Sequence, residues 1–271
     1  MPPWSLYFRL SAALLLFATA LPASQLVTAE VPVLLATALR MTAAAAVFVP
    51  VLWLRREDVR KLSPRDARWI GVIAAFGLIG SSALMLCGTR LLSCGAVCLL
   101  TTTTPAMTAA GAAVFLRDRP NWQKISWLAL GALAAIGLAL HWSDCGPIAE
   151  SPAALLLGGA LVAAAICCEA SYTLAAKVVT ARTAPLTVAA VSTIAAAVAL
   201  APPAAVEAAT FDWDGLSPLA ALAAVWWGAG ALAFGSWLWY SGVRQVRGST
   251  AAAAMTALPV CTLLLSQLVG D

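Results

Sequence analysis

The chain has 271 residues, of which 62% are apolar and only 10% are charged, whereas soluble domains carry roughly a quarter charged residues. So little charge cannot cover a water-exposed surface, which excludes an ordinary soluble domain. The net charge of +4 comes from cations that cluster between apolar stretches without interleaved aromatic residues, so nucleic acid is not an expected partner.

Nine apolar runs along the chain are long enough to be membrane-crossing helices. A hydrocarbon core of about 30 Å requires roughly 20 residues of helix. The first run could also be a signal peptide, because Arg9 precedes its apolar core and small residues follow in ATALPAS. The second run, however, begins only a few residues later. We therefore expect an all-α integral membrane protein with about nine transmembrane helices, at Tyr7–Val27, Val31–Leu54, Trp69–Cys87, Leu92–Leu116, Ile125–Trp142, Ala153–Val179, Pro185–Val206, Leu219–Val243 and Ser249–Val269.

The loops between these runs differ in charge. Thirteen of the sixteen Lys and Arg residues lie in alternate loops, six of them in RREDVRKLSPRDAR between runs two and three. The opposite loops hold only Arg90 as a cation, together with several carboxylates. Cytoplasmic loops of membrane proteins are enriched in Lys and Arg, so the pattern predicts a cytoplasmic amino terminus.

The second half of the chain repeats the first. CGTRLLSCGAVCLLTTTTPAMTA aligns with SGVRQVRGSTAAAAMTALPVCTL without a gap at an offset of 154 residues, and LPASQ in run one lies loosely over CEASY in run six. The chain therefore divides into two five-helix units, 1–142 and 153–271, and an odd number of helices inverts the second unit in the membrane. Matching residues are Gly88, Arg90 and Pro105 with Gly242, Arg244 and Pro259, and Pro32 and Pro50 with Pro185 and Pro203.

Two questions about this repeat stay open. Inverted halves are typical of secondary transporters, in which they rock around a central site, but a duplication could also build only a larger helical bundle. The offset puts the counterpart of Ile125–Trp142 at positions 279–296, beyond the last residue, so we expect a tenth helix to be missing at the carboxyl end. The chain is then either truncated or a nine-helix variant.

Two stretches resemble a known family. VPVLLATALRMTAAAAVFVPVL is similar to the second-helix signature of EamA-type proteins of the drug/metabolite transporter superfamily. GTRLLSCGAVCLLTTTTPAMTAAGAAVFLRD and its copy SGVRQVRGSTAAAAMTALPVCTLLLSQLVGD resemble the duplicated fourth-helix motif, with Asp118 in place of a glutamate and Arg117 in place of a glycine. The resemblance implies a ten-helix transporter of the bacterial inner membrane, with inverted halves around a central cavity. It would move a small metabolite, for example by exporting an amino acid.

Two charged residues lie near the middle of apolar runs. Arg40 in run two and Glu169 in run six would cost about 2.5–3.5 kcal/mol each at the bilayer centre, so they should face the protein interior. They either pair with each other as a structural bridge or contact a polar ligand or a proton during transport. Four more residues near this depth are candidates for substrate binding: Gln25, Tyr172, Trp226 and Trp227. The two adjacent tryptophans point to different faces of their helix, so at most one of them should line a cavity.

Other functions have no motif in the sequence. No G-x-S-x-G, H-E-x-x-H or Gly-rich phosphate loop occurs, so neither an enzyme nor ATP-driven pumping is expected. Cys94 and Cys98 share a helix face, but no neighbouring His or carboxylate completes a zinc site, so we expect no metal and no cofactor. The expected partners are a small-molecule substrate and the lipid bilayer, with a homodimer left open. The competing interpretation is a membrane scaffold protein that transports nothing.

The charge asymmetry of the loops makes a prediction for thiol labelling. In a background without the other native cysteines, a cysteine introduced by Asp58→Cys should resist an impermeant reagent added outside the cell, because its loop is cytoplasmic. Native Cys145 lies in a loop of the opposite set and should react. Labelling whole cells and inverted vesicles measures both, and the reverse pattern would overturn the orientation.

Overall fold

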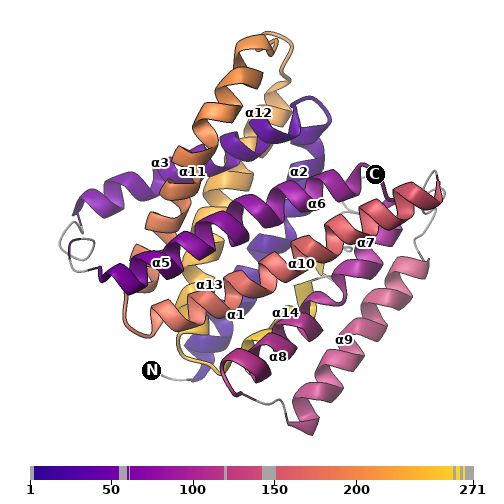
Figure 1. The fold of residues 1–271 in the computed structure, drawn as a ribbon, viewed down its shortest axis with the longest axis vertical. Coiled ribbons are helices and arrows are strands. Elements are labelled where there is room, and N and C mark those ends of the chain that lie inside the picture. Colours follow the sequence, from indigo (N-terminus) through magenta and orange to yellow (C-terminus); the bar gives the residue numbers. More distant parts are fainter. Residues whose placement is uncertain are drawn as a thin grey trace.

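All secondary structure in the described part of the chain is helical (Figure 1), which confirms the all-α class. The computed structural model describes residues 3–54, 60, 62–118, 121–141, 151–258, 261–262 and 265. In chain order the elements are α1 (Pro3–Ala18), α2 (Ala20–Thr28), α3 (Val33–Leu54), α5 (Pro64–Val72), the π-helical η1 (Ile73–Gly80), α6 (Ser81–Thr89), α7 (Cys94–Thr101), α8 (Thr104–Phe115), α9 (Trp122–His141), α10 (Pro152–Thr180), α11 (Pro185–Thr210), α12 (Pro218–Val225), the π-helical η2 (Trp226–Phe234), α13 (Gly235–Val243) and α14 (Gly248–Met255).

Six helical stretches in the described residues are long and apolar enough to cross a membrane. They correspond to runs one, two, three, six, seven and eight of the sequence, so these six expected spans have the length and composition of membrane helices. The count of about nine stays a prediction, and Asp58 and Cys145 lie outside the described residues. The six stretches are Tyr7–Thr28, Val33–Leu54, Pro64–Thr89, Pro152–Thr180, Pro185–Thr210 and Pro218–Val243.

Run four is two helices, α7 and α8, instead of the single helix expected over Leu92–Leu116. At the break, the hydroxyls of Thr102 and Thr103 each donate to the carbonyl three residues earlier at 2.7 Å. Such bonds compete with the regular helical pattern. Pro105 then lies in the first turn of α8, where its missing N–H removes no helical hydrogen bond. The run of threonines before the proline therefore ends one helix and starts the next.

Three helices begin at the same two-residue signal, a serine followed by proline. The serine hydroxyl accepts a hydrogen bond from the backbone N–H three residues later, at 3.1 Å in each case. This satisfies one of the free N–H groups of the first turn, and the proline ring fixes a helical φ. The pairs are Ser63–Pro64 before α5, Ser151–Pro152 before α10 and Ser217–Pro218 before α12.

Two long helices contain a stretch of π-helix at matching places. η1 joins α5 to α6, and η2 joins α12 to α13. η2 begins 153 residues after η1 begins and ends 154 residues after η1 ends, which are the offsets of the sequence repeat. π-helical turns are rare, so their recurrence at one register is a specific feature of this fold.

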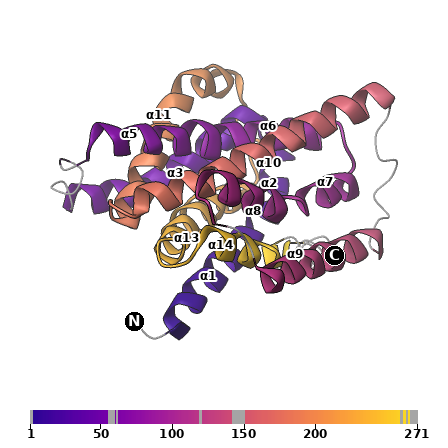
Figure 2. The same ribbon diagram turned by 60° about the horizontal axis from the view of Figure 1, so that its bottom comes forward.

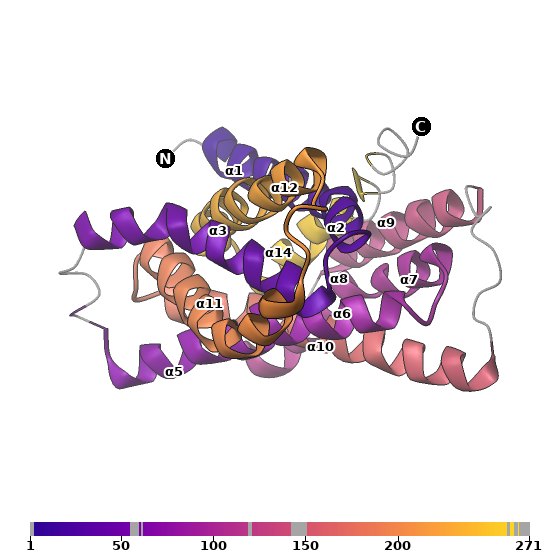
Figure 3. The same cartoon turned by 90° about the horizontal axis from the view of Figure 1, so that it is seen from above.

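The helices pack mainly in pairs that join the first half of the chain to the second. α10 lies along α5, η1 and α6, and α3 lies beside α11 (Figures 1 and 3). α1 packs against α13 (Figure 2), and α8 packs against α14. The largest apolar core is correspondingly shared by helices of both halves.

Glycines allow the closest of these approaches. A Cβ atom at Gly228 of η2 would lie 2.4 Å from the backbone oxygen of Arg40 in α3. Gly88 and its repeat counterpart Gly242 are also tightly covered, by Val162 of α10 and by Leu10 of α1. Small residues permit helix backbones to approach closely in a bilayer, where packing drives association.

A carboxylate joins the halves at the end of α8. The Oδ2 atom of Asp118 accepts hydrogen bonds from the backbone N–H of Ser249 at 2.9 Å and from its hydroxyl at 3.0 Å, at the start of α14. Arg117 before it has a φ of 52°, in the left-handed region that favours glycine. Glycine would adopt this backbone conformation without the steric cost that Arg117 bears.

Gly228→Ala should destabilise the protein, because the new methyl group would meet backbone atoms of α3 that cannot rotate away. We expect a loss of about 1–3 kcal/mol in the free energy of unfolding, as for other overpacked interiors. Gly159→Ala is the matched control, since a Cβ there meets nothing within 4 Å. Thermal unfolding in detergent compares the two variants, and equal stabilities would show that α3 and η2 do not depend on this contact.

Candidate functional site

A cavity of about 610 Å³ lies between helices of both halves. Residues of α1, α2, α3, η1 and α6 line it from the first half, and residues of α10, η2, α13 and α14 line it from the second. The cavity extends to Thr89 and the exposed Arg90 at the end of α6. Its size is in the range of small-molecule sites in proteins.

Arg40 lies on the cavity wall with incomplete partners. Its Nη1 atom donates to the hydroxyl of Ser82 at 3.1 Å, and its guanidinium carbon lies 4.9 Å from the ring centre of Trp227. The Nε atom of Arg40 is buried without a hydrogen-bond partner. A buried guanidinium donor without an acceptor is costly, so this group can take an acceptor from a bound molecule.

Glu169 lies on the same cavity as Arg40. Each charge is close enough to act electrostatically on the other. Within the described residues, however, no ion pair of 4 Å or less joins them. The structure thus brings together the two charged residues that the sequence singled out, without a direct bridge between them.

Three more predicted residues, Gln25, Tyr172 and Trp227, also line this cavity. Trp226 does not line it. Its side chain is 46% exposed and donates from Nε1 to the hydroxyl of Thr19 at 3.0 Å, whereas Trp227 is 3% exposed. Consecutive residues of a helix point in different directions, so only one of the adjacent tryptophans can face the cavity.

Two pairs of aromatic side chains lie at the cavity. The rings of Tyr172 and Tyr240 lie 5.5 Å apart, and those of Phe17 and Trp239 meet edge to face at 6.4 Å. Trp239 and Tyr240 are fully buried. The sequence analysis did not single out Phe17, Trp239 or Tyr240. The aromatic cluster SWLWY of run eight was the available signal.

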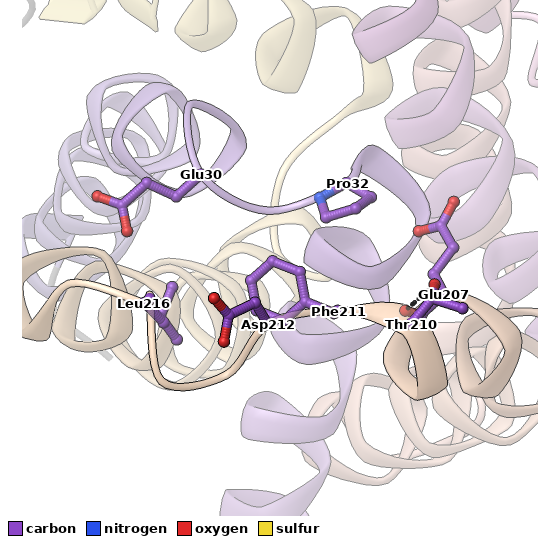
Figure 4. A pocket seen from close by; sticks show the side chains of 8 residues that line it. Glu30, Pro32, Glu207, Thr210, Phe211, Asp212 and Leu216 are labelled. Carbon is purple, nitrogen blue, oxygen red and sulfur yellow. Dashed lines mark hydrogen bonds between the residues drawn. The ribbon is translucent and has the colours of Figure 1, made fainter.

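A second pocket, of about 500 Å³, lies between the ends of α2 and α11 and contains three carboxylates. Figure 4 shows Glu30 and Glu207 at opposite sides of the view, with Asp212 between them. The backbone N–H of Leu35, in the first turn of α3, donates to Oε2 of Glu207 at 2.8 Å. The sequence analysis treated these carboxylates only as loop charges.

Glu30 accepts two hydrogen bonds from Ser217, the residue that caps α12. The hydroxyl of Ser217 donates to Oε1 at 2.6 Å, and its backbone N–H donates to Oε2 at 2.8 Å. These bonds favour the charged form and lower the pKa of Glu30 from its ordinary value of 4.5. Glu30 thus connects the loop after α2 to the start of α12 in the other half.

The described helical bundle has six stretches of membrane-crossing length, and five of them line a cavity that holds Arg40 and Glu169, as expected of a multi-pass membrane protein built like a transporter. The chain belongs to the EamA-like transporter family, which it matches over residues 4–140 and again over residues 156–270. This confirms the family resemblance seen in the sequence. The general class is therefore an integral membrane transporter.

Individual proteins agree with this assignment. The uncharacterized transporter YetK of Bacillus subtilis (strain 168) is 24% identical over 260 residues, which cover 96% of this chain and 78% of YetK. A solved crystal structure of another protein is 22% identical, with a TM-score of 0.77, and covers 98% of this chain and 88% of that one. At this identity, the second likeness supports the fold alone.

The bond between Glu30 and Ser217 predicts a dependence of stability on pH. Because the folded-state pKa of Glu30 is lowered, its contribution is complete above the ordinary value of 4.5 and is lost as the pH falls through the folded-state pKa. Thermal unfolding of the wild type and of Glu30→Gln should therefore differ near neutral pH and converge in acid. Glu207 and Asp212 share the pocket and are unchanged in the variant, so the difference isolates Glu30.

Asp214→Asn is the control for this measurement, because it removes a nearby exposed carboxylate that does not line the pocket. It should keep the pH dependence of the wild type. If Glu30→Gln is as stable as the wild type at every pH, the bonds to Ser217 do not stabilise the fold.

Proposed function

We propose that the protein is a secondary transporter that moves a small metabolite by alternating access between two inverted repeats. The observation that carries the proposal is the central cavity, which is lined from both halves and holds Arg40 and Glu169 without a direct ion pair. A site between repeats has to take its ligands from both of them. Charges kept at this depth without a bridge are expected to serve a ligand or a proton.

The packing of the helices supports the inverted repeat. In the proposed repeat, the segment α1–α2 is the counterpart of α10, and the segment α5–η1–α6 is the counterpart of α12–η2–α13. A two-fold axis in the membrane plane would then superimpose each segment on its counterpart. It turns the pair α1 and α13 into the pair α10 and α6, and both pairs are closely packed. Gly88 contacts Val162 of α10 in one of these pairs, and its counterpart Gly242 contacts Leu10 of α1 in the other.

The substrate that fits these side chains is a small zwitterion such as an amino acid. The free donor of Arg40 suits a carboxylate, since guanidinium and carboxylate groups form strong, directional hydrogen bonds. Glu169 would lie near the amine, and Trp227 and Tyr172 provide apolar surface beside the charges. In a second version of this mechanism, Glu169 exchanges a proton for the substrate.

The charge distribution of the loops supports an amino terminus on the cytoplasmic side of a bacterial inner membrane. In that orientation, α2 and α6 end at the outer surface. The cavity reaches Thr28 and Arg90 there, so the described conformation would be open to the outside. Import or export then depends on the gradients that act on the two sides.

Flux into sealed vesicles tests this proposal. The purified protein, reconstituted into liposomes, should take up at least one radiolabelled amino acid from a panel of standard amino acids, and Arg40→Ala should reduce that uptake at least tenfold. Trp226→Phe is a matched control, because its ring lies outside the cavity. Absence of uptake with every amino acid, and with small carboxylic acids and amines as a second panel, would favour the scaffold interpretation.

A double variant separates a ligand site from a structural bridge. If Arg40 and Glu169 only neutralise each other, either single change should lower stability, and Arg40→Met combined with Glu169→Leu should restore it and leave transport unchanged. We expect instead that the double variant folds and transports poorly. Transport at the wild-type rate would exclude this pair as the substrate site.

A further inference from the structure

The central cavity lies between two walls, each made of helices from both halves. The first wall is α1 with α2 and α13, and the second is α6 with α10 (Figures 1 and 2). The walls meet where α10 and α13 end, which we call the closed end. They are apart where α2 and α6 end, which we call the mouth, and there the cavity reaches Arg90.

Lys177 holds the two walls together at the closed end. Its half-buried ammonium group, on α10, donates to the backbone carbonyls of Val243 at 3.0 Å and Arg244 at 3.2 Å and also to that of Val246. These carbonyls lie at and just beyond the end of α13, where they have no partner within the helix. An ammonium group has three donors and is favoured at the negative end of a helix, so Lys177 matches the three acceptors.

The tyrosine pair lies one layer nearer the cavity and joins the same walls. Tyr172 belongs to α10, five residues before Lys177, and Tyr240 belongs to α13. Their ring centres are 5.5 Å apart. A path from the cavity through the closed end would therefore have to separate both the tyrosine rings and the Lys177 contacts.

The repeat counterparts of these residues are apart at the mouth. Gln25, 147 residues before Tyr172, and Leu86, 154 residues before Tyr240, both line the cavity. In the described part of the chain, α10 packs against α13, whereas α2 and α6 make no contact of comparable extent. The same pair of positions is thus closed in one half of the protein and open in the other.

The lysine itself has no equivalent at the mouth. Its counterpart, 147 residues earlier, is Glu30, a carboxylate that cannot donate to the carbonyls at the end of α6 and is bound to Ser217 instead. The two ends therefore differ chemically at one repeat-related position. The contact made by Lys177 is specific to the closed end.

We propose that Lys177 is a gate residue that keeps the walls together at the closed end and so biases the transporter toward the conformation that is open at the mouth. The inference rests on the proposed alternating access, in which closing the mouth and opening the other end are one movement of the walls. Lys177 is a positioning residue in this scheme, because its hydrogen bonds within the described residues go to backbone carbonyls and it acts on the cavity through the walls.

Pulsed electron spin resonance of doubly spin-labelled protein in lipid nanodiscs tests the gate without any substrate. In a background without native cysteines, labels at Ala181→Cys and Gln245→Cys measure the closed end, and labels at Ala29→Cys and Arg90→Cys measure the mouth. All four positions are exposed. The test variant is Lys177→Met, and Lys177→Arg, which keeps a cationic donor, is its matched control.

Loss of the charged hydrogen bonds should raise the ratio of molecules with the walls separated at the closed end to molecules with the walls joined there roughly tenfold. The closed-end labels should gain a population at longer distance, and the mouth labels should gain one at shorter distance. Lys177→Arg should keep the wild-type distributions. If methionine prevents folding, Lys177→Gln, with an uncharged amide donor, should give a smaller shift in the same directions.

Two results would overturn the gate. Unchanged distances in a folded Lys177→Met protein would show that the contact does not control access. Longer distances at the closed end without narrowing of the mouth would show local loosening, which is a structural role only. Flux is a separate readout. If the distances shift as expected but the protein transports none of the tested solutes, the proposed transport is contradicted and the proposed gate is not.

Discussion

The charge of Arg40 is the constraint around which the centre of this protein is arranged. A guanidinium group inside an apolar helical bundle is tolerated only if polar or aromatic groups surround it. Gly228 contributes to this arrangement. Because it has no side chain, η2 can pack directly against the backbone of α3 at Arg40. The preceding residue, Trp227, then lies with its ring beside the guanidinium carbon. The close backbone packing and the position of Arg40 on the cavity wall are thus linked in the structure.

Carboxylates from one half repeatedly contact the first turn of a helix in the other half. Glu207 accepts from the start of α3, Glu30 from the start of α12, and Asp118 from the start of α14. Free N–H groups and the helix dipole make the first turn of a helix a favourable place for an anion. The two halves are joined by these polar contacts at their ends and by apolar packing between them.

Hydropathy was enough to predict the all-α class and six spans, because a bilayer permits few alternatives, and the resemblance of particular sequence stretches was enough to predict the family. Hydropathy and charge together were enough to find Arg40 and Glu169, since a charge in an apolar run is conspicuous. The break between α7 and α8 was missed because hydropathy does not register threonine hydroxyls that bond to the preceding turn. The roles of Trp239, Tyr240 and Lys177 were missed because they depend on which helices meet, and hydropathy contains no information about neighbours.

The π-helical stretches have a consequence for the origin of the chain. A wide turn of this kind shifts the register of every following residue in its helix, so it is seldom gained twice at one position by chance. η1 and η2 occupy equivalent places in the two halves. Duplication of a half that already contained the π-helical turn would produce this recurrence. Under the proposed inverted repeat, one half alone could not enclose the cavity, because each half supplies only part of its lining.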